Sequence, residues 1–196
     1  MDDINISYTD FYQYFINVVT NGNHWFFTPR QVGMTTCGIN YILKFCSDNK
    51  TNGVYLTPDG RQSDEILCKR YIDWYGWVTY RKNVIRNNGN TIYITDKYNE
   101  ILYGYKNLGI SIFIFDNFSS KYKFPDDIKP LYDNNVKCVF LETKEDKKFI
   151  EIKRIYNNIL NNKNLILHYL TLNDFVNMKG ILRKEKIIEI FGDILK

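Results

Sequence analysis

The most constraining feature of this sequence is residues 25–38, WFFTPRQVGMTTCG, in which an apolar run, a polar turn and a helix-like segment follow one another. The apolar run is typical of a buried strand, and Pro29 prevents that strand from continuing. Gly33 is a point where the backbone can approach a ligand closely, and a helix is predicted from Thr35. The apolar face of that helix is formed by Ile39, Ile42, Leu43 and Cys46. A turn that opens a helix in this way predicts a phosphate-binding loop.

The loop departs from the usual phosphate-loop pattern, G-x-x-x-x-G-K-[ST], in its first half and at its lysine. Thr28 stands where the first glycine is expected, and Met34 stands where the lysine is expected. Methionine has no charge and no hydrogen-bond donor, so it cannot neutralise phosphate. On the loop alone, a phosphate loop and an ordinary strand–helix turn are equally supported.

The rest of the chain alternates strand-like and helix-like segments, which predicts an α/β fold with a mainly parallel central sheet flanked by helices. Strands are predicted at residues 53–57, 109–115, 135–141 and 165–170, and helices at residues 8–20, 146–160 and 183–195. A further helix is predicted to begin at Ser63, with that side chain as its N-cap. Residues 78–105 are predicted to form a β-hairpin insertion, with turns at Asn88-Gly89 and around residues 96–99.

The composition of the chain excludes several kinds of site and does not indicate a particular activity. The chain has 196 residues, and we expect a single domain over residues 1–196, because no linker or repeat divides it. The net charge of +4 permits contact with nucleic acid without arguing for it. With 2 histidines and 4 isolated cysteines we expect no zinc site, and we expect neither haem nor flavin. No signal peptide or membrane span is expected, since no apolar run is long enough.

Polar residues follow two of the predicted strands at the edge where α/β proteins bind ligands. Asp116 ends the run IFIF, and Glu142-Thr143 ends the next strand. The hydroxyl of Thr35 and the carboxylate of Asp116 are groups that hold Mg²⁺ in phosphate-loop proteins. Loop and acid together predict a single P-loop NTPase domain of the RecA/ASCE-like type.

Several stretches resemble the ATPase domain of the large terminase subunit, the DNA-packaging motor of tailed phages and herpesviruses. TPRQVGMTTCGINYILKF resembles its Walker A segment, which often reads S-R-Q-x-G-K-T-T, and GISIFIFDNF resembles its Walker B strand. Four further stretches also resemble segments of that family: GVYLTPDGRQSDEILCKRY, VIRNNGNTIYITD, IKPLYDNNVKCVFLETKED and FYQYFINVV. The resemblance covers roughly residues 8–170 and includes no nuclease domain.

The resemblance implies a role for each matching residue. Arg30 would contact the γ-phosphate, Gln13 would contact adenine, and Thr143 would belong to the coupling motif. The implied nucleotide-binding set is Gln13, Arg30, Gln31, Gly33, Met34, Thr35 and Thr36. The implied catalytic set is Arg30, Asp116 and Asn117, with Thr35 and Asp116 as ligands of Mg²⁺. ATP is the implied nucleotide.

Two replacements oppose catalysis. Met34 takes the place of the Walker A lysine, and Asn117 takes the place of the glutamate that activates water. Asparagine cannot act as a general base. An engineered change would explain Met34 but not Asn117, so natural degeneracy is favoured.

Three hypotheses follow. The favoured one is a degenerate terminase-like subunit of a viral packaging or assembly complex, which binds or regulates and hydrolyses ATP weakly or not at all. The second is an active ATPase of a split terminase that a partner subunit completes, and the third is an unrelated α/β domain. The implied partners are packaging proteins, double-stranded DNA and further copies of the chain, in the cytoplasm of an infected cell or its nucleus.

Overall fold

The computed structural model describes residues 8–19, 22–29, 33–67, 76–81, 84–117, 131, 135–143 and 165–170. The described helices are α1 (Tyr8–Val18), α2 (Met34–Asn49), α3 (Gly60–Leu67) and α5 (Tyr98–Gly104). The described strands are β1 (Asn23–Thr28), β2 (Asn52–Leu56), β3 (Val78–Arg81), β4 (Val84–Asn87), β5 (Asn90–Thr95), β6 (Ile110–Asp116), β7 (Lys137–Thr143) and β8 (Leu165–Tyr169). The helices predicted at residues 146–160 and 183–195 lie outside the described residues.

Within that part of the chain, one 8-stranded sheet has the order β3-β4-β5-β2-β6-β7-β1-β8. The six strands from β5 to β8 in that order are parallel, and β3, β4 and β5 are antiparallel. The mainly parallel α/β sheet predicted from the sequence is therefore confirmed. Because parallel strands end at one edge, the ends of β1, β6 and β7 lie together, with β7 between the other two.

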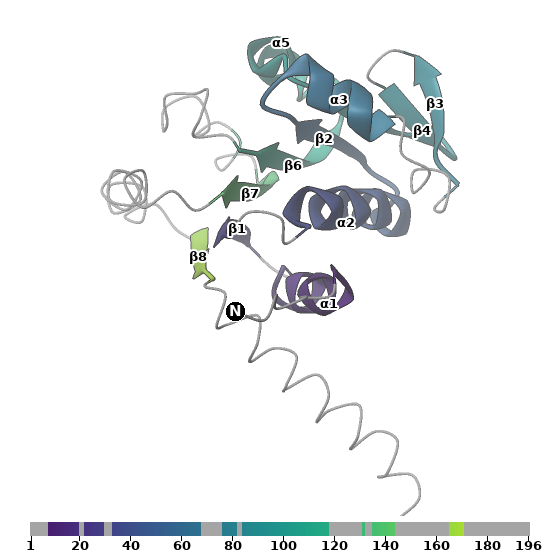
Figure 1. Cartoon of the computed structure of the whole chain (residues 1–196). Coiled ribbons are helices and arrows are strands. Elements are labelled where there is room, and N and C mark those ends of the chain that lie inside the picture. Colours follow the sequence, from purple (N-terminus) through teal and green to yellow (C-terminus); the bar gives the residue numbers. More distant parts are fainter. Residues whose placement is uncertain are drawn as a thin grey trace, which may run out of the picture.

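Apolar side chains bury both faces of this sheet. Helices α1 and α2 lie side by side along one face (Figure 1), and with Ile66 of α3 they enclose one core cluster. The second cluster includes Tyr98 and Tyr105 of the α5 segment. The predicted apolar face of α2 is confirmed, since each of its four residues is at most 1% exposed. Strands β6 and β7 are buried over most of their length, as expected of strands covered on both sides.

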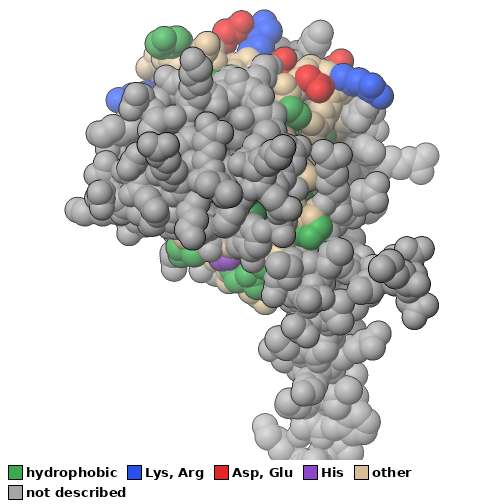
Figure 2. Space-filling model, turned by 60° about the vertical axis from the view of Figure 1, so that its left-hand side comes forward, with side chains coloured by type: hydrophobic (Ala, Val, Ile, Leu, Met, Phe, Trp, Pro, Cys, Tyr) green, Lys and Arg blue, Asp and Glu red, His purple; other side chains and the backbone are tan. Residues whose placement is uncertain are grey.

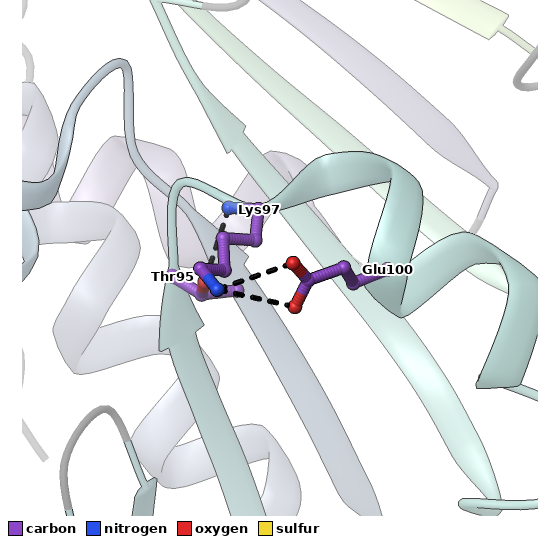
Figure 3. Close-up of polar contacts among 3 residues, drawn as sticks. All are labelled: Thr95, Lys97 and Glu100. Carbon is purple, nitrogen blue, oxygen red and sulfur yellow. Dashed lines mark hydrogen bonds and ion pairs between the residues drawn. The ribbon is translucent and has the colours of Figure 1, made fainter.

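The hairpin predicted around Asn88-Gly89 is confirmed, and the one predicted around residues 96–99 is wrong. Asn88 and Gly89 have φ of 46° and 87°, the left-handed conformation that a two-residue hairpin turn requires. The chain after β5 instead forms α5, since its apolar residues recur at helical spacing and not in alternation. The start of that helix is shown in Figure 3, where the Lys97 ammonium pairs with Glu100 and the Lys97 N–H donates to Thr95 Oγ1.

The predicted N-cap of α3 is also wrong. Ser63 lies inside the helix and is fully buried, where its hydroxyl contacts that of Thr57. Asp59 caps the helix instead, because its Oδ1 accepts the Gln62 N–H at 2.8 Å. The helix therefore begins at Gly60, close to the end of β2. This earlier start brings Gln62 to the edge of the sheet where the polar residues gather.

Candidate functional site

The predicted phosphate-binding loop connects β1 to α2. Its strand ends at the buried Thr28, and its helix begins directly after Gly33. Gly33 has φ 79° and ψ 22°, a left-handed conformation that disfavours any residue with a Cβ. The Gly33 carbonyl accepts the Cys37 N–H at 2.9 Å. The N–H groups of the residues between these two have no acceptor within an α-helix. Arg30 and Gln31, which the resemblance assigns to nucleotide, lie outside the described residues.

Met34 points back into the base of this loop. It is the first residue of α2, it is 7% exposed, and it belongs to the core cluster beneath the helices. The Thr28 hydroxyl has two acceptors, Met34 Sδ at 3.1 Å and the Pro29 carbonyl oxygen at 3.2 Å. The two residues that depart from the phosphate-loop pattern are therefore in contact with each other. We call this pair the Met34 contact.

Asp116, at the end of β6, receives hydrogen bonds from three elements. Thr35 Oγ1 of α2 donates to Asp116 Oδ2 at 2.8 Å, and Gln62 Nε2 of α3 donates at 2.9 Å. Tyr55 of β2 donates through its hydroxyl to the same oxygen at 2.9 Å. These four residues are the Asp116 cluster. The structure therefore brings Thr35 and Asp116 together as the sequence suggested, and adds Tyr55 and Gln62, which the sequence reasoning missed.

The buried position of Asp116 is electrostatically costly. Its side chain is 1% exposed, and burial raises the pKa of the carboxyl from 3.8 to about 6. The hydrogen bonds from Thr35, Tyr55 and Gln62 act in the opposite direction, because they stabilise the charged form. The carboxylate thus remains ionised near neutral pH in a site that would otherwise favour its protonated form.

Tyr55 reaches Asp116 from beneath α2, and Gly38 makes room for it. A Cβ built on Gly38 would lie 3.2 Å from a Tyr55 ring carbon and 2.6 Å from Leu141 Cδ1. Tyr55 is fully buried, and its hydroxyl also contacts the Thr35 carbonyl at 3.3 Å. The phenol therefore fixes the first turn of α2 relative to the end of β6. In the sequence, Tyr55 reads as one more apolar strand residue, so only the fold reveals its polar role.

Asn117, which directly follows β6, forms hydrogen bonds with β7. Its backbone has φ 49°, which asparagine tolerates better than most residues, and its N–H donates to the Leu141 carbonyl at 2.7 Å. The side-chain Oδ1 accepts both the hydroxyl of Thr143 at 2.9 Å and its N–H at 3.2 Å. Its Nδ2 donates to Asp116 Oδ1 at 3.3 Å. Asn117 therefore links the ends of β6 and β7, where the resemblance places the Walker B and coupling residues.

The other two candidates lie at the margin of this arrangement. Thr36 is half-buried in α2, where its carbonyl accepts the Asn40 side-chain amide at 3.1 Å. Gln13 is an exposed residue of α1, and within the described part of the chain no hydrogen bond links it to the loop. A contact between Gln13 and adenine stays a prediction.

The two histidines contact each other. His24 Nδ1 and His168 Nε2 are 3.0 Å apart, and the Tyr14 hydroxyl lies 3.4 Å from His168 Nδ1. Burial and the neighbouring His24 lower the pKa of His168 to about 4, so His168 is neutral at neutral pH. The described residues contain no group of three or more His, Cys, Asp and Glu side chains that could hold a metal ion.

A magnesium ion bound together with a nucleotide requires fewer protein ligands than an isolated metal site. Mg²⁺ prefers oxygen ligands and keeps several waters, so one hydroxyl and one carboxylate are enough when phosphate supplies the rest. Thr35 and Asp116 provide that pair of groups, 2.8 Å apart, beside the start of α2. The residues present therefore fit the ion that the resemblance implies.

Comparisons with known proteins support the fold and leave the activity open. No protein-family model matches the sequence, and no curated protein is significantly similar to it. Among solved structures, the chain is similar to the large terminase from a thermophilic bacteriophage, in complex with ADP. The TM-score is 0.53 and the identity 14%, over 81% of this chain and 42% of that one. The chain thus has the fold of part of a large terminase and spans less than half of that protein's length.

The described surface adds two facts. Figure 2 shows acidic and basic side chains near one another at the upper end of the view. In the described residues no helix is long and apolar enough to cross a membrane.

Proposed function

We propose that this protein is a degenerate terminase-like P-loop domain of a viral DNA-packaging or assembly complex. In this proposal it binds nucleotide as a binding or regulatory subunit and hydrolyses ATP weakly or not at all. The Met34 contact is the observation that carries the proposal. A buried thioether hydrogen-bonded to Thr28 occupies the lysine position, so this position offers no charge to the β- and γ-phosphates.

Nucleotide binding is supported by the part of the site that retains its usual groups. The start of α2 after Gly33 offers N–H groups and the positive end of the helix dipole to phosphate. Thr35 and Asp116 would hold Mg²⁺, which neutralises phosphate charge when bound. Gln13, Arg30, Gln31 and Thr36 complete the proposed nucleotide contacts by resemblance.

Weak hydrolysis is supported by the contacts of Asn117. Its Oδ1 already accepts two hydrogen bonds from Thr143, and an amide cannot take a proton from water. Loss of general-base catalysis alone lowers a rate by about 10²- to 10⁴-fold. Met34 and Asn117 each stand in place of a group that hydrolysis would need. We therefore propose that this site holds nucleotide as a structural or regulatory ligand.

The biological setting is part of the same proposal. We propose one ATPase-like domain over residues 1–196 whose partners are packaging or assembly proteins, double-stranded DNA and other copies of the chain. It would act in the cytoplasm of an infected cell, or in the nucleus of a eukaryotic host. The terminase-type fold is the support for this setting.

Calorimetric titration of Mg·ADP and Mg·ATP into the purified protein, together with a phosphate-release assay, tests the function. We expect saturable binding of both nucleotides and little release of phosphate. Absence of binding at millimolar nucleotide overturns the nucleotide site. Phosphate release at the rate of an active packaging ATPase would overturn the proposal of a degenerate domain and favour an active ATPase.

The double variant Met34→Lys with Asn117→Glu tests whether the scaffold is preserved. We expect this variant to bind Mg·ATP more tightly than the natural chain and to release phosphate measurably faster. Tyr103→Lys with Asn107→Glu is the matched control, since it adds the same side chains at exposed positions. A folded double variant with no gain over this control contradicts a preserved P-loop site.

A further inference from the structure

Helix α3 is attached to the candidate site through its first turn. Asp59 caps the helix by accepting the Gln62 N–H, and the buried Ser63 contacts the Thr57 hydroxyl just after β2. Both contacts hold the backbone on either side of the Gln62 side chain. The direction of that side chain is therefore limited, and its amide reaches Asp116 Oδ2 at 2.9 Å.

The acceptor oxygen of Asp116 has more donors than a carboxylate oxygen usually serves. Each oxygen has about two lone-pair sites, whereas Oδ2 receives Thr35, Tyr55 and Gln62. The other oxygen, Oδ1, receives the Asn117 amide at the longer distance of 3.3 Å. A cation drawn to this carboxylate would compete with donors already on Oδ2.

Gln62 is the donor that can leave most easily. Tyr55 is fully buried under α2, and Thr35 belongs to the helix that forms the loop. Gln62 is half-buried, with three rotatable side-chain bonds, on a helix of 8 residues. Loss of its hydrogen bond would therefore affect α3 first and leave the loop in place.

Resting on the proposed nucleotide site, we propose that Gln62 is a positioning residue, through which α3 responds to cation-bound nucleotide. In the nucleotide-free protein Gln62 orients the Asp116 carboxylate and holds α3 against the end of β6. When Mg·ADP binds, the cation competes for the carboxylate, Gln62 releases Oδ2, and the first turn of α3 loosens. ADP without Mg²⁺ leaves Gln62 on Asp116, because phosphate alone does not compete for that oxygen.

Hydrogen–deuterium exchange of α3 and of the first turn of α2 tests this proposal. In the natural chain we expect Mg·ADP to slow exchange at the start of α2 and to speed exchange in residues 60–67. The increase should be about 3- to 10-fold, as for the loss of one hydrogen bond. ADP with EDTA should leave α3 unchanged.

The variant Gln62→Met keeps the length of the side chain and removes its donor. We expect α3 in this variant to exchange faster without nucleotide, by the same factor, and to show no further change on adding Mg·ADP. Gln62→Ala also removes the donor and places no methionine side chain against the site. It should show the same exchange behaviour as Gln62→Met. Asp64→Ala, at an exposed position of the same helix, is the matched control and should follow the natural chain.

Three outcomes decide the question. Equal α3 exchange in Gln62→Met, Asp64→Ala and the natural chain would mean that Gln62 does not hold the helix. A response of α3 to Mg·ADP that persists in Gln62→Met would mean that the response takes another route, and either result overturns the proposal. If Mg·ADP does not slow exchange at the start of α2 in the natural chain, the proposed function fails instead. The comparison without nucleotide then still decides whether Gln62 docks α3.

Discussion

The Asp116 cluster and the Met34 contact lie on the same helix start and are built in opposite ways. In the cluster, three side chains donate to one buried carboxylate, and each comes from a different element. In the Met34 contact, one hydroxyl meets an uncharged sulfur atom and the Pro29 carbonyl, and the methionine belongs to the apolar core. In the proposed function, the cluster supplies the polar groups for an ion, whereas Met34 packs into the core where the phosphate-loop pattern has a lysine. This difference is the basis of the proposal that the site binds nucleotide and hydrolyses it weakly or not at all.

The largest expected difference between the two regions is in their pH dependence. The folded-state pKa of Asp116, about 6, lies above its ordinary value of 3.8, so the folded protein binds this proton more tightly than the unfolded chain. The stability gained from protonation is therefore complete below about pH 4 and is lost as the pH rises through 6. The size of this change is about 3 kcal/mol.

Urea unfolding of the natural chain and of Asp116→Asn at several pH values measures this contribution. As the pH falls from 7.5 to 4, the free energy of unfolding of the natural chain should rise relative to that of Asp116→Asn. The free energy of unfolding of Met34→Leu should change with pH as that of the natural chain does. Parallel curves for all three proteins would show that Asp116 does not titrate as its burial implies.

The second expected effect is the loss of one donor from the cluster. Tyr55→Phe keeps the buried ring and removes the hydroxyl that contacts Asp116, so the free energy of unfolding should fall by about 1.5–3 kcal/mol. The pKa of Asp116 should also rise above 6, because one of the groups that lower it is gone. A variant as stable as the natural chain in thermal and urea unfolding would contradict the geometry of the cluster.

A third change acts on the cluster through packing. Gly38→Ala would bring a methyl group against Leu141 and Tyr55, and we expect it to cost about 1–3 kcal/mol despite the better helix propensity of alanine. Gly104→Ala is the control, since a Cβ at Gly104 meets no atom within 4 Å. If both variants are equally stable in urea unfolding, α2 can shift without cost and Gly38 is not required for Tyr55.

The smallest effect is expected at the Met34 contact. Thr28→Val keeps the volume of the side chain and removes a single donor, which is divided between sulfur, a weak acceptor, and the Pro29 carbonyl. We expect a loss below about 1 kcal/mol in urea unfolding. A loss as large as that of Tyr55→Phe would mean that the two regions do not differ in the way described above.

The sequence predicted the elements better than it predicted the site. Apolar runs and helical periodicity indicated β1, α2, β6 and β7, because both patterns are visible in residues that are neighbours in the chain. The helix α5 was missed because residues 98–105 follow a true hairpin and contain aromatic residues common in strands. The N-cap of α3 was misplaced because Asp59 and Ser63 are both good caps, and only the end of β2 selects between them.

The sequence by itself determined that this chain has a strand–loop–helix with a methionine for the lysine, and an acid at the end of an apolar strand. These are local facts, fixed by residue order. Only the tertiary structure decided that Thr35, Tyr55 and Gln62 meet on one oxygen of Asp116, and that Met34 turns inward to Thr28. The physical reason is that parallel strands bring distant segments to one edge of the sheet, where the direction of each side chain depends on neighbours far away in the chain.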